Sequence, residues 1–532
     1  MHRTGERRTQ LPVLAARAPD AVIAPHAAPA ADAPRIGVLT LGCDKNTVDS
    51  ERLLARLAGA GAHVTNDIGA ADVVVINTCG FIDVAKEESV DAILGALRLK
   101  QAGRVRAVVA IGCMVQRYKP ELQRELPEVD LFLGLTEAER LVPELRARGL
   151  LDNTVTVSTM EQPLRLLSTA TRHTSYLKIS EGCDHTCAFC AIPLMRGKHR
   201  STPIDVLVRE AQDLEQSGVV ELNLISQDTT WYGRDSLRGA TDASGDWFIG
   251  RTFSAMPNVD RALLTGRDAG ATVAERVSRA ASGDRRQGLL PELLQALLDH
   301  TSIPWLRLFY MYPSGIYREL VELIASEPRI VPYIDMPIQH GSDSVLKRMR
   351  RPERQATIRE RVTWLRAAIP GVALRTTVIV GFPGESDDEF DDMVELLEEI
   401  RFDHLGAFSY SIEEDTHAAA MQDHVDDGVK RERLEQLLDV QRTISQERNE
   451  QWLGRDVTVL IDALTGRAMD DPSAPVVEAG AIARTARQAL EIDGVVHIEN
   501  ARGSRPGEFV RARITHVLED DMKAEIRDRT VD

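Results

Sequence analysis

The chain has 532 residues, more than one ordinary domain holds, so we expect two to four domains. No apolar run approaches the roughly 20 residues that a membrane-spanning helix needs, which predicts a soluble protein without membrane attachment. The formal net charge of −17 argues against a protein whose main task is to wrap nucleic acid, because such proteins are usually basic. The six cysteines are too few for a disulfide scaffold, which favours metal ligation in a reducing compartment.

Residues 1–34 are rich in Ala, Pro and Arg and show no apolar periodicity. A secretory signal needs a continuous apolar core, which Pro25, His26, Pro29 and Asp32 interrupt. We therefore expect a disordered extension, or residues that precede the true start of the protein.

Three short apolar runs stand out between residues 35 and 150. They are Arg35–Cys43, Asp72–Cys79 and Arg106–Cys113. Each is rich in β-branched residues and does not alternate, as expected of strands buried on both faces. Helical stretches at Asp49–Ala60 and Ala85–Lys100 separate them, and this alternation predicts a parallel α/β sheet.

Each of these runs ends on a cysteine, and Cys43, Cys79 and Cys113 form the first triad. Their spacings of 36 and 34 residues match about one βα repeat. Because parallel strands end at one edge of a sheet, where such sheets bind ligands, the three thiols should converge there. The alternative is that they are three small buried hydrophobic residues.

From residue 169 to 448 the alternation resumes on a larger scale. The expected strands are Ser175–Ser180, Val219–Ser226, Trp305–Met311, Val331–Ile338, Val372–Val380 and His404–Ser411. The expected helices are Ile204–Gln216, Leu290–Leu298, Tyr317–Ser326, Arg354–Ala368 and Asp387–Ile400, the last opened by a capping box of Ser386 and Glu389. Six βα repeats predict a partial (βα)6 TIM-like barrel.

Residues 235–287 interrupt this pattern, and we interpret them as an insertion made largely of loop. The tail from Trp452 to Ile526 differs again, because short alternating runs at Asp456–Ile461, Val495–Ile498 and Glu508–His516 lie between Gly and Pro turns. This pattern is typical of a small antiparallel β-barrel.

The second triad is Cys183, Cys187 and Cys190, three thiols in eight residues just after the first barrel strand. Such a loop can wrap a four-iron cluster and leave one iron open, because fully ligated clusters usually take four cysteines. An open site lets a metal centre bind substrate. The alternatives are a disulfide loop or a zinc site, and zinc would require a fourth ligand such as His185.

With these two triads in this order, followed by a small β-barrel, the chain resembles the radical SAM methylthiotransferases (SAM is S-adenosylmethionine). The likeness covers about Arg35 to Asp520 apart from the insertion. It implies a methylthiotransferase N-terminal domain at 35–150, a radical SAM core at 169–448 and a TRAM domain at 452–520.

The resemblance also implies the cofactors, which are SAM and two 4Fe-4S clusters, each held by three cysteines with one open iron. The open iron at the second triad binds the amino and carboxylate groups of SAM, and one electron then cleaves SAM to methionine and a 5′-deoxyadenosyl radical. The cluster at the first triad holds or donates a sulfur that a second SAM methylates. The methylthio group then joins the substrate radical.

Local motifs divide this family by substrate. Gly42–Asn46 (Gly-Cys-Asp-Lys-Asn), Met195–Lys198 and Ile225–Thr229 resemble the RimO branch, whereas the tRNA-modifying MiaB branch typically has Gly-Cys-Gln-Met-Asn at the first motif. The RimO branch modifies the β-carbon of one aspartate in small-subunit ribosomal protein S-twelve, so the resemblance implies that substrate. Neither the sulfur donor nor the electron donor follows from the sequence.

Charge favours the same substrate. Ribosomal proteins are basic and this chain is acidic, although acidity can also serve solubility alone. Between Trp452 and Asp532 there are 11 Lys and Arg against 15 Asp and Glu, the wrong sign for a stable grip on nucleic acid. Two rival hypotheses remain: methylthiolation of an adenosine in tRNA, and a single-cluster or non-catalytic protein whose first triad is structural.

Three further residues are candidates for binding SAM. Gln227 and Asp228 follow the second barrel strand, where radical SAM proteins commonly contact the methionine amino group; the alternative is an ordinary loop turn. Arg375 lies within the fifth strand and could face the barrel lumen and meet a carboxylate.

Overall fold

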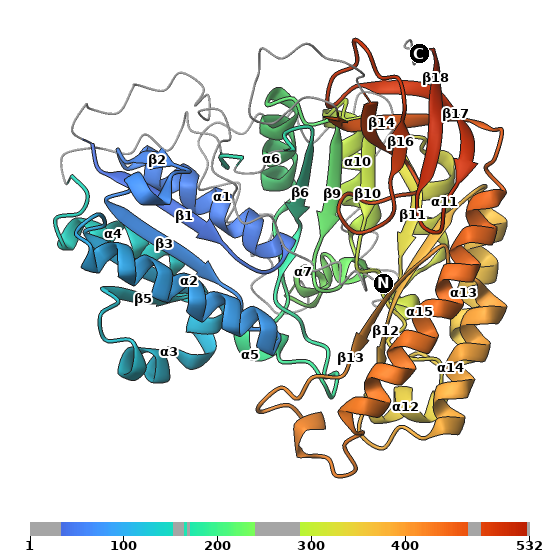
Figure 1. Cartoon of the computed structure of the whole chain (residues 1–532), viewed down its shortest axis with the longest axis horizontal. Helices are drawn as coiled ribbons and strands as arrows, with labels where there is room; N and C mark the ends of the chain where they lie inside the picture. Colours follow the sequence, from blue (N-terminus) through green and yellow to red (C-terminus); the bar gives the residue numbers. More distant parts are fainter. Residues whose placement is uncertain (1–32, 153–163, 168–170, 240–287, 466–479, 529–532) are drawn as a thin grey trace, which may run out of the picture. The chain divides into compact units, whose positions relative to one another are not determined.

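The computed structural model describes residues 33–152, 164–167, 171–239, 288–465 and 480–528 (Figure 1). The chain divides into two compact units. The first unit comprises the described part of residues 1–170 with Ala191–Lys198, and the second comprises the described part of 171–190 and 199–532. The expected extension at 1–34 and the expected insertion at 235–287 lie almost wholly outside the described residues. Within the described part of the chain, no helix is long and apolar enough to cross a membrane.

The first unit contains a five-stranded sheet in the order β2-β1-β3-β4-β5, and all of its strand pairs are parallel. The strands are β1 (Arg35–Thr40), β2 (His63–Thr65), β3 (Val73–Thr78), β4 (Ala107–Gly112) and β5 (Leu131–Gly134). The prediction of a parallel α/β sheet is confirmed. The sequence did not reveal β2 and β5, because these edge strands have only three and four residues.

Helices cover both faces of this sheet. They are α1 (Asp44–Gly59), α2 (Asp83–Gln101), α3 (Cys113–Glu125) and α4 (Leu141–Ala147). Val73 and Val75 of β3 pack in a core with α1 and α4, whereas Val74 and Ile76 pack in a second core with α2 and α3. Burial on both faces explains why the strand sequences are continuously apolar.

The second unit contains a six-stranded sheet whose strands lie side by side in chain order (Figure 1). They are β6 (Thr174–Lys178), β9 (Glu221–Ile225), β10 (Trp305–Leu308), β11 (Ile330–Asp335), β12 (Ala373–Val380) and β13 (His404–Ser409). All pairs are parallel and the sheet stays open between β6 and β13. Each of the six predicted strands is present, so the partial (βα)6 barrel is confirmed.

The connecting helices form one layer, because each long helix contacts the next in chain order. These are α6 (Ile204–Gln216), α10 (Leu290–His300), α11 (Arg318–Ser326), α13 (Gln355–Ala368), α14 (Asp387–Ile400) and α15 (Asp427–Glu450). Shorter pieces of the second unit are β7 (Ser180–Glu181), β8 (Arg200–Ser201), α7 (Arg234–Gly239) and α12 (Asp343–Arg348), whereas the short helix α5 (Ile192–Arg196) belongs to the first unit. The predicted capping box opens α14: Glu389 N donates to Ser386 Oγ at 3.3 Å, and Ser386 N donates to Glu389 Oε2 at 3.1 Å.

A closed five-stranded barrel ends the described chain, with strand order β14-β15-β16-β18-β17. Its strands are β14 (Asp456–Thr465), β15 (Gly480–Thr485), β16 (Val496–Ile498), β17 (Phe509–Val517) and β18 (Met522–Asp528). The barrel is antiparallel except where β16 meets β18 in parallel. The predicted boundary at 520 falls short of β18, because Met522 and Ala524 are its only fully buried side chains and give a weak apolar signal.

A buried ionic network joins this small barrel to the six-stranded sheet. Glu221, the first residue of β9, accepts from Arg484 Nη2 at 2.6 Å and from Arg307 Nε at 2.8 Å. Arg484, at the fifth position of β15, also donates through Nε to Asp462 Oδ2 at 2.7 Å. Burial alone would raise the pKa of Glu221, but the two guanidinium groups lower it to about 2. The carboxylate is therefore held charged in the interior.

We expect Arg484→Met to destabilise the second unit by about 3–5 kcal/mol, because the change leaves Glu221 and Asp462 as underpaired buried charges. Urea denaturation followed by tryptophan fluorescence measures this, since the Trp305 ring lies 4.9 Å from the ring of Phe509 on the small barrel.

Arg513→Met is the matched control. It removes an arginine from the same barrel, but this arginine pairs with Asp456 at the surface, so it should cost less than about 1 kcal/mol. Equal costs for the two variants would contradict a special role for the buried network.

Candidate functional site

The first triad lies at the carboxyl edge of the five-stranded sheet. Cys43 follows β1 and is the residue before α1, Cys79 directly follows β3, and Cys113 directly follows β4 as the first residue of α3. The strand order 2-1-3-4-5 reverses direction between β1 and β3, and crevices at such switch points are where open α/β sheets bind ligands. The three thiols are close enough to interact electrostatically, so the expected convergence is observed.

Gly42 permits the close approach of Cys43 and Cys79. Its φ of +92° lies in the left-handed region, which residues with a side chain avoid. A Cβ at this position would lie 2.7 Å from the Cβ of Cys79 and 2.8 Å from its sulfur. Any other residue would therefore push the loop before α1 away from the end of β3.

Asn46 contacts all three loops that carry the cysteines of the first triad. Its side-chain amide donates to the carbonyl oxygens of Leu41 at 2.7 Å and Thr78 at 3.3 Å, and so connects the ends of β1 and β3. Its Oδ1 lies 3.7 Å from the sulfur of Cys113. Asn46 is fully buried, and one amide thus touches all three loops that carry the cysteines.

Arg196 supplies a buried positive charge beside the first triad. Its guanidinium donates to Asn46 Oδ1 at 2.6 Å and to Asp49 Oδ2 at 3.2 Å, within the first unit. Burial raises the pKa of Cys113 to about 12, and Arg196 opposes that rise. The pKa of Cys79 is also raised, again mainly by burial. Arg196 therefore favours the thiolate form that a metal would bind.

The second triad lies on the loop after β6 and β7, where the barrel prediction placed it. Cys183 is buried, and burial raises the pKa of its thiol to about 12. The loop is anchored on both sides at Ala188, whose N–H donates to Met349 O at 2.9 Å and whose carbonyl accepts from Ala418 N at 2.8 Å.

His185 lies inside this loop but is committed elsewhere. Its Nε2 is 2.7 Å from Asp228 Oδ2, and its ring lies between Trp231 and Tyr312, with centroids 4.0 and 4.1 Å away. These contacts give His185 a different role from that of a fourth zinc ligand. All six cysteines are free thiols, which also sets the disulfide alternative aside. Among the described residues, no three His, Cys, Asp or Glu side chains are arranged to hold a single metal ion.

Cys187 is contacted by two potential donors. Tyr312 Oη lies 3.6 Å and Arg351 Nη1 lies 3.8 Å from its sulfur. Burial raises the pKa of Tyr312 well above its usual value, so the hydroxyl keeps its proton and can donate to a thiolate. A sulfur with charged and neutral donors beside it is a suitable ligand for an iron cluster.

The two candidates after β9 differ in the structure. Asp228 is 1% exposed, and its carboxylate is taken by His185 and by Thr230, whose N–H and hydroxyl donate at 3.0 and 2.6 Å. Asp228 therefore organises the cysteine loop. Gln227 is half-buried, and no hydrogen bond to its side chain is found within the described residues, so it stays a candidate for ligand binding.

The assignment of Arg375 to SAM stays a prediction. In the structure its guanidinium pairs with Asp335 at 2.8 Å and with Asp493, which precedes β16, at 3.6 Å. Both carboxylates are almost fully buried and compensate the charge of Arg375. The chain positions of these partners, 40 residues before it and 118 after it, gave no signal in the sequence.

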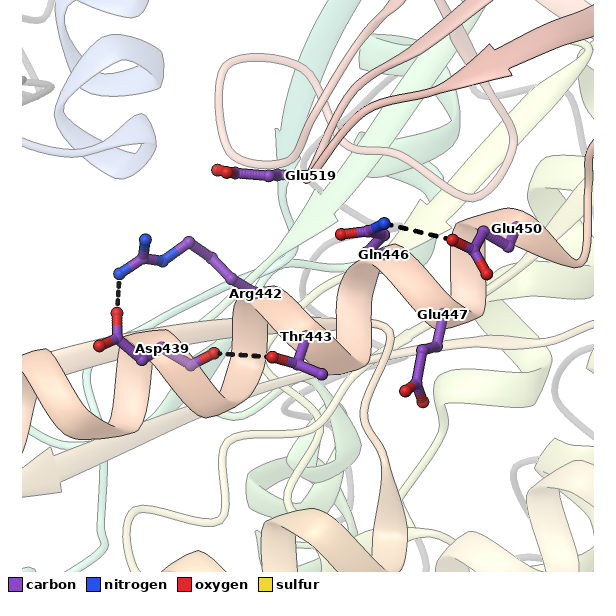
Figure 2. A pocket seen from close by; sticks show the side chains of 7 residues that line it. All are labelled: Asp439, Arg442, Thr443, Gln446, Glu447, Glu450 and Glu519. Carbon is purple, nitrogen blue, oxygen red and sulfur yellow. Dashed lines mark hydrogen bonds and ion pairs between the residues drawn. The ribbon is translucent and has the colours of Figure 1, made fainter.

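A hollow of about 560 Å³ lies elsewhere in the second unit, between α15 and the turn before β18 (Figure 2). Its lining residues are Asp439, Arg442, Thr443, Gln446, Glu447, Glu450 and Glu519. In Figure 2, Arg442 turns to Asp439 and Gln446 donates to Glu450 at 3.2 Å. This lining contains none of the cysteines, and we assign it no chemistry.

Sequence reasoning missed the residues that support the thiols. Arg196 lies in the motif Met195–Lys198 and Asn46 lies in the motif Gly42–Asn46, but the sequence assigned neither residue a role beside the thiols. Tyr312 and Arg351 had no signal, because nothing local relates them to a cysteine more than 120 residues away.

Three family models match successive parts of the chain. Residues 35–134 match the family described as "Uncharacterized protein family UPF0004", residues 177–397 match the radical SAM superfamily, and residues 453–526 match the TRAM domain. In the same order, these stretches correspond to the five-stranded sheet, the six-stranded sheet and the closed barrel.

Curated relatives align over nearly the whole chain. The ribosomal protein uS12 methylthiotransferase RimO of Anaeromyxobacter sp. (strain Fw109-5) is 42% identical over 498 residues, which covers 92% of each chain. The RimO proteins of Geobacter sulfurreducens and Aquifex aeolicus are 37% and 36% identical, with 92% of this chain and 98% and 96% of theirs covered. Among solved structures, the cobalamin-dependent SAM radical enzyme OxsB aligns with a TM-score of 0.46 at 14% identity, over 78% of this chain and 56% of that one.

In metal-free protein at pH 8, we expect iodoacetamide to modify Cys43 at least tenfold faster than Cys113. Cys43 is exposed, whereas Cys113 is buried with a pKa of about 12, so only about one Cys113 in ten thousand is a thiolate at that pH. Peptide mass spectrometry over a time course gives both rates. In concentrated urea the two rates should converge, and a difference that persisted there would contradict the structural explanation.

Proposed function

The chain belongs to the RimO family of radical SAM methylthiotransferases, and we propose that it transfers a methylthio group to an aspartate side chain of ribosomal protein uS12. Its cofactors are two 4Fe-4S clusters and SAM. The observation that carries the proposal is the presence of two separate thiol triads, each just beyond the strands of its own parallel sheet. One cluster is enough for radical formation from SAM, so a second supports a separate role in sulfur delivery.

For the second triad, we propose that Cys183, Cys187 and Cys190 bind three irons of the cluster that cleaves SAM. The thiols are free and lie on one short, anchored loop, and three ligands leave one iron open for the amino and carboxylate groups of SAM. Gln227 is the residue of this chain that we propose contacts the methionine part of SAM, because it follows β9 and its side chain is free to do so.

For the first triad, we propose that Cys43, Cys79 and Cys113 bind the cluster that carries the transferred sulfur. Arg196 supports this, because a buried cation beside three thiols favours their thiolate form. Asn46 contributes by holding together the three loops that carry the thiols. In the alternative, a purely structural triad, Arg196 would serve only to bind Asp49 and Asn46. Free thiols fit the reducing cytoplasm, the compartment that we propose.

Two arginines of the TRAM barrel and the charge of the whole chain support a protein substrate over tRNA. Arg484 and Arg487 are buried or half-buried and pair with Glu221, Asp462 and Asp403, so they do not face the phosphates of a nucleic acid. The whole chain carries a net charge of −17, which attracts a basic ribosomal protein and repels RNA.

Incubation of the reconstituted enzyme with SAM, a low-potential reductant and either uS12 or tRNA tests the substrate. We expect a mass increase of about 46 Da on one aspartate of uS12, from exchange of H for SCH3, and no change in tRNA nucleosides. Mass spectrometry of both products provides the measurement. Methylthiolation of tRNA alone would refute the proposed substrate and favour the MiaB-like activity.

Iron and sulfide counting tests the ligand sets. Two clusters predict about eight irons per chain, and the triple variant Cys43→Ala, Cys79→Ala, Cys113→Ala should keep about four. This variant should still cleave SAM, because the second triad is intact, but should not form product.

A triple variant that keeps all of its iron would show that the first triad is not a ligand set. Ser89→Ala is the matched control near Cys79, since it removes a hydroxyl that binds the backbone of Cys79 and leaves every thiol in place. It should keep about eight irons.

A further inference from the structure

Four side chains form a continuous column in the second unit. The rings of Trp231 and His185 have centroids 4.0 Å apart, and those of His185 and Tyr312 are 4.1 Å apart and almost parallel. The guanidinium carbon of Arg351 lies 3.8 Å from the centroid of Tyr312. These residues come from four separate segments, so the stacking contacts between them hold the four segments together.

The column ends on one sulfur. The Tyr312 hydroxyl and Arg351 Nη1 lie 3.6 and 3.8 Å from the sulfur of Cys187. Arg351 is held in this orientation by a donation from Nη2 to Pro337 O at 3.0 Å, and it is 2% exposed. Water and salt therefore screen its charge little.

Arg351 has a counter-ion on its other edge. Its Nε lies 3.2 Å from Glu353 Oε2, and Glu353 is also buried and accepts from Ser314 Oγ at 2.9 Å. The guanidinium thus presents Nη1 to the sulfur and Nε to the carboxylate. The cation beside the Cys187 sulfur and its counter-ion can therefore be removed one at a time.

We propose that Arg351 is a positioning residue that, with Tyr312, raises the reduction potential of the iron–sulfur cluster at the second triad. The inference rests on the proposed function, because Cys187 must bind iron. When bound, this cluster accepts one electron from an external low-potential reductant and passes it to SAM. The electron adds negative charge, which a fixed cation and hydrogen bonds to a ligating sulfur stabilise. Glu353 acts in the opposite direction and limits the rise.

Redox titration followed by electron paramagnetic resonance tests the proposal. The full-length chain carrying Cys43→Ala, Cys79→Ala and Cys113→Ala is the background, so that the signal comes from the second triad alone. Relative to this background, Arg351→Met should lower the equilibrium constant for reduction about tenfold, which is about 59 mV for one electron. Tyr312→Phe keeps the ring in the column but loses the hydroxyl, and should shift the potential less in the same direction.

Glu353→Gln gives the decisive comparison, because it should shift the potential in the opposite direction, upward. Gln can still accept from Ser314, so the packing is preserved. Arg359→Met is the control: it removes an arginine that pairs with Glu399 at the surface, and the potential should stay unchanged.

The inference would be overturned if Arg351→Met and Glu353→Gln both had the same reduction potential as the control. It would also be overturned if both variants shifted the potential in the same direction. If Arg351→Met does not assemble a cluster, Glu353→Gln and the charge-preserving Arg351→Lys still decide, since the equilibrium constant of the latter should stay within about twofold of the background. A background protein without any cluster signal would instead refute the ligand assignment of the second triad.

Discussion

Parallel strand direction is the constraint on which the rest of this structure depends. In a parallel sheet every strand ends at the same edge, and the chain must return by a helix before it can reach that edge again. Cys43, Cys79 and Cys113 are separated by about one such return each, so the fold of the first unit brings them together without local contact between them. The second unit uses the same edge differently, because a single loop after β6 carries all three of its thiols.

Buried arginines are the second recurring feature, and each has a carboxylate or amide that compensates for lost water. Arg484 is paired with Glu221, Arg196 with Asp49, and Arg351 with Glu353. An isolated cation in these positions would be strongly destabilising, whereas a paired one costs less and leaves a directed field. At Arg484 the ion pairs connect the small barrel with the six-stranded sheet of the second unit. At the two triads the directed field acts on thiols.

The fold could be predicted where the strands are long and apolar on both faces. All of the central strands of both sheets were predicted, whereas β2 and β5 were missed because they are very short. The strand β15 was missed because Ile482 is its one large apolar residue, and β18 because only Met522 and Ala524 of its side chains are buried. Site residues were predictable only when their spacing carried the signal. Arg375 was singled out by its place in a strand, but its buried partner Asp493 could not be foreseen, because it lies 118 residues away in the chain.

The sequence by itself determined the two thiol triads and the order of the three domains, because these depend on cysteine spacing and on the period of apolar residues. The methylthiotransferase family followed from the resemblance of its motifs. Only the tertiary structure decided which side chains support the thiols. Asn46 and Arg196 are 150 residues apart, and Cys187 and Arg351 are 164 apart. No local pattern relates such pairs, since their distance is set by the packing of whole segments. The same packing brings Asp228 against His185, a contact between residues 43 apart in the chain.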